Sequence, residues 1–472
     1  MPPRHETEIC VIGGGPAGSG VALRLAQLGH RVTLVERAAF PRAHIGESLP
    51  PSILPTLAAL GLRDRIERAG FLRSHGSILY WGGEFERRGT SPGAPGLLVD
   101  RARFDALLLH AAAEAGVTVL QPARAHRPRR TTQGWDIPLR GETPQTIHTR
   151  LLIDAAGKQA GLARKFRRCS QPLLALYAYW QPPPGFGPET RVEAGEAQWY
   201  WGALLPDGTV NATIFLDPAR AAGLSPADRR DLYLNLLAQS TLLSPCLDTS
   251  RRGHVRSCDA TSYAEQTPPS AHLLRVGEAS FSIDPLSSQG VQSALGQTMQ
   301  TAAVAHTLLT RPDDTELALT FAADRQTERI RTHATLAADY YAQQAQHHPN
   351  PFWTDRATPP GWLTTPHPDL LDTLPPSDLP LRLSPEAALT PSAIQTEALI
   401  RSETALTHPN LNRPVVFLDG LRIAPLLHRV PPGQSADVIA CTWASQITPE
   451  QATKLLTWLW RNRILIPAQN VR

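Results

Sequence analysis

A glycine-rich turn near the start of the chain constrains its fold more than any other feature. The sequence EICVIGGGPAG occupies positions 8–18, and an Ala- and Leu-rich run follows it to position 28. An apolar run, a G-x-G-x-x-G turn and a helical run predict a strand, a tight turn and a helix. A second strand is predicted over 31–35, and it ends in Glu36.

Each glycine of this turn has a mechanical role. Gly13 permits the tight turn, Gly15 lets the backbone approach a pyrophosphate, and Gly18 lets the helix pack close to the strand. The helix N-terminus offers N–H groups and a positive dipole end to phosphates. Glu36 follows Gly18 by 18 residues, where a carboxylate can bind ribose hydroxyls. These features predict a dinucleotide site in an α/β fold.

Composition excludes several other classes of protein. The chain has 472 residues, a net charge of +4 and no long basic run, so we expect no nucleic-acid partner. Its five cysteines match no metal-ligand spacing, which indicates free thiols in a reducing compartment and no metal. Membrane-length apolar runs and a secretory signal are absent from the sequence. We therefore expect a soluble, cytoplasmic protein with no membrane partner.

The texture of the sequence changes along the chain. We expect a Rossmann-like dinucleotide domain to comprise 1–160 and 271–346, with a β-sheet substrate domain inserted at 161–270. A proline-rich linker is expected over 347–391. Strands are predicted over 172–180, 196–205, 209–217 and 272–276, and long helices over 289–309 and 315–346.

A small α+β module is predicted over 392–472, and a winged-helix-like arrangement with a terminal hairpin is one option for it. Its predicted elements are helices over 394–402 and 449–462 and strands over 414–418, 438–442 and 464–467. Several large apolar residues of this module form either its own core or a surface that docks a protein. They are Trp443, Leu455, Leu456, Trp458, Leu459 and Trp460.

Two later motifs indicate which dinucleotide binds. LVDRARFD at 98–105 leads into a helix, and LRVGEASFSIDPLSSQG at 274–290 contains the end of a predicted strand. In the second motif Glu278 follows the strand and Gly290 opens a helix. A carboxylate there can bind a ribityl hydroxyl, and the helix N-terminus can face the electron-rich end of a reduced flavin. The pattern therefore favours FAD over NAD.

With these motifs, residues 6–356 resemble the p-hydroxybenzoate-hydroxylase-like family of FAD monooxygenases, flavin-dependent halogenases and geranylgeranyl-reductase-like enzymes. FPRAHIGESLPP at 40–51 and DAAG at 154–157 add to the resemblance, whereas Glu278 replaces the usual Asp of the third motif. The resemblance implies FAD as cofactor, O2 as co-substrate, and NAD(P)H or a separate reductase as electron donor. The inferred FAD contacts are Gly13, Gly15, Ala17, Gly18, Glu36, Arg37, Ser48, Arg101, Gly277, Glu278 and Gly290.

Two departures from the family pattern count against halogenation. Related halogenases have a lysine that carries or activates hypohalous acid, and Ser74 stands at that position. Their W-x-W-x-I-P motif is represented by the longer WYWGALLP at 199–206. The resemblance then implies hydroxylation of an electron-rich aromatic ring through a flavin C4a-hydroperoxide. Glu47 and His75 are the candidate catalytic groups for proton transfer.

Within that family, the chain resembles the flavoproteins that hydroxylate a peptidyl tryptophan during maturation of tryptophylquinone enzymes such as quinohaemoprotein amine dehydrogenase. This resemblance implies a polypeptide substrate that docks near the C-terminal module. A small-molecule phenol or indole hydroxylase and a halogenase remain alternatives. An alternative of a different class is a non-catalytic flavin-binding assembly factor.

Overall fold

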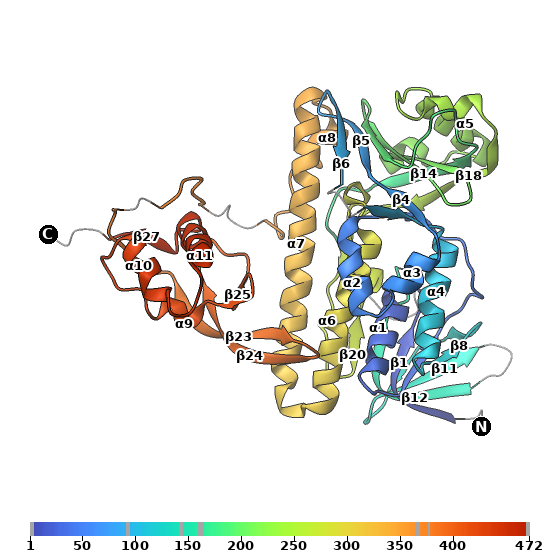
Figure 1. Ribbon diagram of the computed structural model, residues 1–472. Coiled ribbons are helices and arrows are strands. Elements are labelled where there is room, and N and C mark those ends of the chain that lie inside the picture. Colours follow the sequence, from blue (N-terminus) through green and yellow to red (C-terminus); the bar gives the residue numbers. More distant parts are fainter. Residues whose placement is uncertain are drawn as a thin grey trace. The chain divides into compact units, whose positions relative to one another are not determined.

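The first strand and helix form where the glycine-rich turn predicts them. Strand β1 (Arg4–Ile12) leads into helix α1 (Pro16–Gln27), and strand β2 (Val32–Val35) follows (Figure 1). Pro16 opens α1 at a position where its missing N–H costs no hydrogen bond. The computed structural model describes residues 4–90, 95–140, 145–158, 165–364, 369–375 and 378–468.

The first sheet is built around β1. Five parallel strands run in the order β8, β2, β1, β12 and β20, and short antiparallel strands flank β12. Helices α4 (Arg101–Glu114) and α6 (Gly290–Thr310) pack against α1. The other strands are β8 (Thr118–Leu120), β9 (Arg124–Ala125), β10 (Arg129–Arg130), β11 (Trp135–Arg140), β12 (Gln145–Asp154) and β20 (Leu273–Arg275). The expected α/β fold with a dinucleotide-type sheet is confirmed.

A second sheet has seven strands in the order β18, β14, β17, β16, β15, β5 and β6. Its strands β14, β16 and β17 lie where the sequence predicts strands. Two strands of this sheet, β5 and β6, come from the N-terminal 160 residues. The sheet is therefore not built from residues 161–270 alone. The bounds are β5 (Gly76–Trp81), β6 (Glu84–Gly89), β14 (Leu174–Trp180), β15 (Thr190–Ala194), β16 (Gln198–Leu204), β17 (Val210–Leu216) and β18 (Arg251–Asp259).

The two faces of this second sheet differ. Leu176, Ala178 and Trp180 project from β14 into a core that includes residues of helix α5 (Pro226–Leu237). The alternate residues of β14, Tyr177 and Tyr179, project to the opposite face because successive strand residues point to opposite sides. That opposite face carries part of the candidate site.

Smaller elements complete the larger part of the chain. Strands β3 (Ser48–Leu49), β4 (Leu72–Ser74) and β7 (Gly96–Leu98) form one small sheet. A second consists of β13 (Phe166–Arg168), β19 (Tyr263–Glu265) and β21 (Phe281–Ser282). Helices α2 (Leu54–Ala59), α3 (Arg63–Arg68), α7 (Thr315–His347) and α8 (Pro351–Thr354) also belong to the described chain. Among the described residues, no helix combines the length and apolar character needed to cross a membrane.

The chain divides into two units. Unit 1 comprises residues 1–315 and 322–364, and unit 2 comprises 316–321 and 365–472. The start of the proline-rich stretch is therefore packed within unit 1, where Trp353 and Leu363 are buried.

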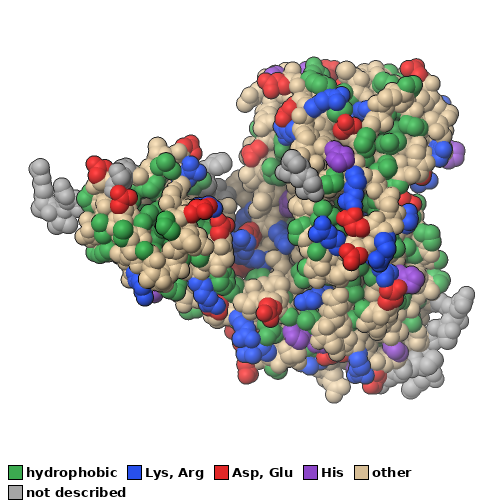
Figure 2. All heavy atoms as spheres, in the orientation of Figure 1, with side chains coloured by type: hydrophobic (Ala, Val, Ile, Leu, Met, Phe, Trp, Pro, Cys, Tyr) green, Lys and Arg blue, Asp and Glu red, His purple; other side chains and the backbone are tan. Residues whose placement is uncertain are grey.

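Positive and negative side chains are interspersed over the face drawn in Figure 2.

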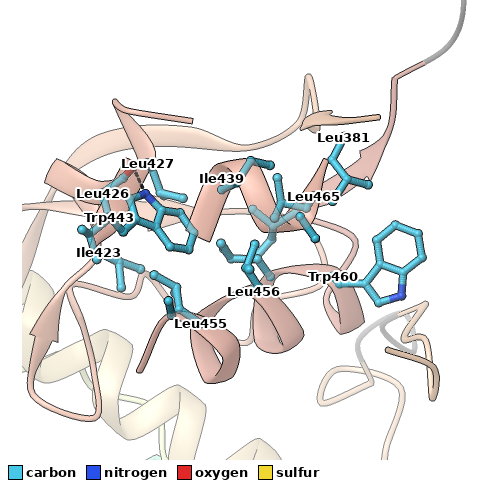
Figure 3. Packing of buried hydrophobic residues seen from close by; sticks show 14 of the residues in the cluster. Leu381, Ile423, Leu426, Leu427, Ile439, Trp443, Leu455, Leu456, Trp460 and Leu465 are labelled. Atoms are coloured by element: carbon cyan, nitrogen blue, oxygen red, sulfur yellow. Dashed lines mark hydrogen bonds between the residues drawn. The ribbon is translucent and has the colours of Figure 1, made fainter. Parts of the chain in front are cut away.

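Unit 2 has its own apolar core. Trp443 is fully buried, and its indole N–H donates to the Leu426 carbonyl over 2.9 Å (Figure 3). Leu455, Leu456, Leu459 and Trp460 also belong to this core, whereas Trp458 is partly buried against it. Five of the six predicted residues, Trp443, Leu455, Leu456, Leu459 and Trp460, therefore serve the core of unit 2.

Two predicted elements of unit 2 are wrong, and the described residues, which end at 468, contain no terminal hairpin. Residues 394–402 contribute to a hairpin rather than a helix, and 438–442 lie in a helix rather than a strand. The last strand pairs with β22, which precedes the helices, rather than with a neighbouring hairpin strand. The observed elements are β22 (Leu381–Leu383), β23 (Ala388–Thr396), β24 (Leu399–Thr407), β25 (Phe417–Leu418), β26 (Leu421–Arg422), α9 (Ala424–Leu427), α10 (Ala436–Trp443), α11 (Pro449–Arg461) and β27 (Leu465–Pro467).

Replacement of Trp443 by alanine should unfold unit 2 selectively. Removing a fully buried aromatic side chain costs about 3–5 kcal/mol. The core around Trp443 contains residues of unit 2 only. We therefore expect the backbone amides of unit 2 to lose protection in hydrogen exchange, while the amides of unit 1 keep theirs. Val438→Ala is the matched control, since Val438 lies on the same helix but is exposed. Equal loss of protection in both units would contradict separate cores.

Candidate functional site

Three loops of unit 1 begin at one edge of the first sheet. Ile12, the last residue of β1, pairs with Asp154 of β12, and Asp154 in turn pairs with Arg275 of β20. The strands are parallel, so the segments that follow them leave the sheet side by side. The carboxyl edge of a parallel sheet is where such folds bind ligands. The glycine-rich turn at 13–18, the segment 154–157 and the motif that contains Gly277 therefore meet at one edge of the sheet.

Two glycines of the first turn are required by the packing of the protein itself. Gly13 has a φ of 107°, and a Cβ added to it would lie 2.5 Å from the Ala155 carbonyl oxygen. A Cβ added to Gly18 would overlap the Gly13 carbonyl oxygen. These contacts hold the start of α1 against the ends of β1 and β12. Gly13 and Gly18 therefore serve the turn and the close packing of the helix, as predicted from the sequence.

Gly15 lies in a different environment. A Cβ added there would meet only the Arg42 guanidinium within 4 Å, at 3.4 Å. The space beside the N-terminus of α1 is thus open at the position where the sequence places a pyrophosphate. Backbone N–H groups and the helix dipole favour an anion there. Arg42 adds a positive charge to the same place.

Glu36 is buried, and both of its carboxylate oxygens accept hydrogen bonds. Oε2 accepts from the Gly14 N–H over 2.6 Å, and Oε1 accepts from the Ala38 N–H over 2.8 Å. The carboxylate therefore braces the glycine turn, and each oxygen keeps a second lone pair for a ribose hydroxyl. Arg37, the next residue, is exposed.

Arg101 contacts another part of the protein. Its buried guanidinium makes two hydrogen bonds to Asp105, of 2.9 and 3.1 Å, and donates to the Ile45 carbonyl over 2.6 Å. The anion that stabilises this cation at the start of α4 is thus Asp105, one helical turn later. Arg101 thereby fixes the loop that leads to Glu47, a role that the sequence analysis did not anticipate.

The third motif completes the same edge. Gly277 has a φ of 66°, and a Cβ added to it would lie 2.7 Å from the Ala17 Cβ, so this position requires glycine. Glu278 is exposed, and its carboxylate lies beside Gly157, from the loop that follows β12. Gly290 opens α6 with open space around it.

These features fit a dinucleotide cofactor. We call the group formed by residues 13–18, Glu36, 154–157, 277–278 and the start of α6 at Gly290 the cofactor cradle. It combines two helix N-termini, open space at two glycines and two carboxylates for hydroxyl groups. Bound FAD would be held by these residues, with its pyrophosphate at Gly15.

Glu47 lies where the first part of the chain meets the second sheet. Its Oε1 accepts hydrogen bonds from the Tyr179 hydroxyl over 3.0 Å and from the Asn211 amide over 3.3 Å. Oε2 accepts from the Gly46 N–H over 2.8 Å. Burial raises the pKa of Glu47, and these hydrogen bonds oppose the rise only in part. A carboxyl group in this environment can exchange protons closer to neutral pH.

The sheet face around Glu47 is rich in aromatic residues. Trp201, Thr213 and Tyr177 form one row across β16, β17 and β14. The next row contains Asn211 and Tyr179, the two residues that bind Glu47. Directly opposed residues share a face, so all five side chains project to the side where Glu47 lies. Alternation in the sequence LALYAYW at 174–180 was the available signal for the two tyrosines.

Other predicted positions lie outside this group. His75 is exposed at the bend between β4 and β5, and no hydrogen bond joins its side chain to Glu47. Ser48 begins β3, next to Glu47, and is half-buried. Ser74 is buried, and its hydroxyl donates to the Gly76 carbonyl over 3.1 Å. The structure thus joins Glu47 to the aromatic face but does not join His75 to it.

Comparison with known proteins places these features in context. Residues 6–167 match the protein family described as FAD binding domain. The chain is 30% identical over 372 residues to tryptophan 2-halogenase of Chondromyces crocatus, covering 74% of this chain and 70% of that protein.

Solved structures give two further likenesses. The peptidyl tryptophan dihydroxylase QhpG, essential for tryptophylquinone cofactor biogenesis, is 27% identical with a TM-score of 0.75; the match covers 97% of this chain and 99% of that one. The flavin-dependent halogenase CmlS is 20% identical with a TM-score of 0.84, covering 98% and 96%. The second likeness concerns the fold alone.

Alanine at Gly15 and at Gly18 should have opposite consequences. Gly15→Ala should keep the melting temperature of the cofactor-free protein, because φ at this position is −69° and the space is open. It should weaken FAD binding about tenfold or more, since the added carbon takes the place of a phosphate oxygen. Gly18→Ala should lower the melting temperature, because its Cβ overlaps Gly13. Unchanged FAD affinity of Gly15→Ala in a fluorescence titration would contradict the assigned cradle.

The ionisation of Glu47 should appear in the pH dependence of stability. Because its pKa is raised in the folded state, the folded protein holds a proton that the unfolded chain has released between the two pKa values. The free energy of unfolding should therefore fall as pH rises through that interval. Glu47→Gln removes this term, so the variant should gain stability relative to the wild type as pH rises. Urea unfolding at a series of pH values measures the difference; parallel curves would contradict a raised pKa.

Proposed function

We propose that this chain, which belongs to the family of FAD-dependent oxidoreductases and halogenases, hydroxylates the indole ring of a tryptophan within a partner polypeptide. Its family establishes it as an oxidoreductase that uses FAD and O2, so FAD takes part in a reaction and does not merely stabilise an assembly factor. Two of the similar proteins, tryptophan 2-halogenase and the peptidyl tryptophan dihydroxylase QhpG, act by their names on tryptophan or on peptidyl tryptophan. Both therefore support an indole ring as the substrate.

The position of Ser74 carries the choice of oxygen over halogen. The sequence contains three lysines, at 158, 165 and 454. Lys158 forms an ion pair with Asp259 and lies 4.6 Å from the centre of the Tyr263 ring. Lys454 pairs with Glu450 on helix α11 of unit 2, and Lys165 is exposed. No ammonium group stands at position 74, where the halogenases have theirs, and a hydroxyl group cannot replace its charge.

Residues of the chain would bind and orient the ring. FAD held by the cofactor cradle would supply the oxygen-transfer chemistry. The aromatic face of Tyr177, Trp201 and Tyr179 suits stacking or edge contacts with an indole. After oxygen enters the ring, the ring carbon must lose its proton. Glu47 would accept that proton at Oε1 or Oε2, with Tyr179 holding the carboxylate in place.

A polypeptide substrate is supported by the likeness to the peptidyl tryptophan dihydroxylase, which is 27% identical to this chain. That match includes unit 2 as well as unit 1. The halogenase CmlS matches over a similar extent, so the presence of unit 2 does not by itself select the substrate. Since the large apolar residues of α11 serve the core of unit 2, docking of the polypeptide would use other, exposed residues such as Phe417.

The proposal is tested with chemically reduced holoenzyme, so that the electron donor need not be known. The enzyme is mixed with isotopically heavy O2, chloride and bromide, and either a tryptophan-containing peptide or free tryptophan. Mass spectrometry should show heavy oxygen in the peptide and no halogen in either substrate. Halogenated product would overturn the proposal. Oxygen in free tryptophan alone would favour a small-molecule hydroxylase.

Two variants separate the roles of the residues. Glu47→Gln should lower the hydroxylation rate by about 100-fold while FAD absorbance is retained, as expected for loss of a proton acceptor. Ser74→Ala should leave the rate within a few-fold of the wild type, because the proposal gives the Ser74 hydroxyl no chemical role. A hydroxylation rate for Glu47→Gln equal to that of the wild type would remove Glu47 from the mechanism.

A further inference from the structure

A cavity of about 320 Å³ lies in unit 1. Its wall consists of α7, the segment that follows β13, the residues after β21 and the turn after α8. The cavity is large enough for several water molecules and is partly open to solvent. Its lining includes Asp284, His333, Ala334, Tyr341 and Arg356.

Asp284 is the most deeply buried acid of this lining. Its Oδ1 accepts a hydrogen bond from the Leu286 N–H over 3.0 Å. The Tyr341 hydroxyl donates to Oδ2 over 3.2 Å, and both side chains are buried. The acid belongs to the loop 284–290, which ends at Gly290 where α6 opens in the cofactor cradle. One short segment thus connects the cavity to the cradle.

The overall reaction of an FAD-dependent monooxygenase consumes a proton. One oxygen atom of O2 enters the substrate and the other leaves as water. The electron pair comes from the anionic reduced flavin together with its hydrogen, and the balance needs one further proton from solution. Where bound FAD excludes water from the cradle, this proton must come through a group of the protein.

We propose that Asp284 relays protons between water in this cavity and the cofactor cradle, with the Tyr341 hydroxyl holding its carboxyl group in position. The proposal rests on the assignment of the chain to FAD-dependent oxidoreductases and not on the identity of the substrate. The carboxyl group of Asp284 gives its proton toward the cradle. A new proton then reaches the Asp284 oxygen atoms from water in the cavity.

The electrostatic surroundings suit a group that gains and loses protons. Burial raises the pKa of Asp284 to about 6, against the opposing effects of the Leu286 N–H, Tyr341 and the charge of Arg356. Burial also raises the pKa of Tyr341, which keeps its hydroxyl neutral and able to donate. The other titratable or charged groups that line the cavity are Arg168, Cys169, His333, Asp355 and Arg356. Burial and the charge of Arg329 lower the pKa of His333, which favours its neutral form.

Infrared spectroscopy of the oxidised holoenzyme without substrate tests the first requirement. Raising the pH from about 5 to about 7 should remove a protonated-carboxyl band with a midpoint near the pKa of about 6. Asp284→Asn should lack this band, and Tyr341→Phe should shift its frequency because a hydrogen bond is lost. If no band in this range depends on Asp284, the proposal is wrong. Tyr341→Phe keeps the test available should Asp284→Asn fail to fold.

The route through the cavity is tested by filling it. Ala334→Phe places a ring in the cavity, whereas Thr335→Phe, one residue later, places the same ring on an exposed face of α7. On transfer to heavy water, the Asp284 band should shift at least about tenfold more slowly in Ala334→Phe than in the wild type. Thr335→Phe should match the wild type. Equal exchange in the two variants would show that protons reach Asp284 by another path.

The link to the cofactor is tested by stopped-flow reoxidation of the reduced enzyme by O2, again without substrate. Asp284→Asn should slow the proton-dependent step about 100-fold and abolish its pH dependence near pH 6. FAD affinity should remain that of the wild type. An unchanged pH profile of reoxidation would contradict the relay and leave the proposed hydroxylation intact. Absence of hydroxylation together with an altered pH profile would contradict the hydroxylation and leave the relay intact.

Discussion

The close approach of α1 to β1 is the contact on which the rest of unit 1 depends. Gly18 rests against the Gly13 carbonyl with no room for a side chain between them. This approach brings the helix N-terminus over the sheet edge where Ile12, Asp154 and Arg275 are aligned. Gly277 repeats the device by packing against Ala17 of the same helix. The cofactor cradle is therefore a product of backbone packing more than of side-chain chemistry.

Two buried carboxyl groups show how different surroundings suit different tasks. Glu47 meets donors from the second sheet and from its own loop, so its position depends on how that sheet docks. Asp284 depends on one tyrosine and one backbone N–H and borders a cavity. The first group faces an aromatic surface and the second lines a cavity. Burial raises the pKa of both, so each can change protonation without leaving its place.

The sequence predicted the elements with strong local signals and missed those that tertiary contacts decide. The turn at 13–18 and the helices at 290–310 and 315–347 follow from glycine spacing and apolar period. The hairpin of β23 and β24 turns at Glu397 with a φ of 51°, without the glycine or asparagine that usually marks such a turn. Helix α10 contains Val438 and Ile439, whose β-propensity is outweighed by the Ser435 cap and burial of Trp443. Tyr341 reaches Asp284 from 57 residues away, which no local pattern reveals.

The interleaving of the second sheet has a consequence for biosynthesis. Strand β5 pairs with β15, more than a hundred residues later in the chain. While the chain emerges from the ribosome, the β5–β6 hairpin therefore waits with an unpaired edge and an exposed apolar face until residues near 190 have been made. The predicted dinucleotide domain and the predicted β-sheet domain cannot fold one after the other, because the sheet of the second contains β5 and β6 from the first. The second sheet of unit 1 can therefore be completed only late in synthesis. Until then, the unpaired strand edge must be protected from association with other chains.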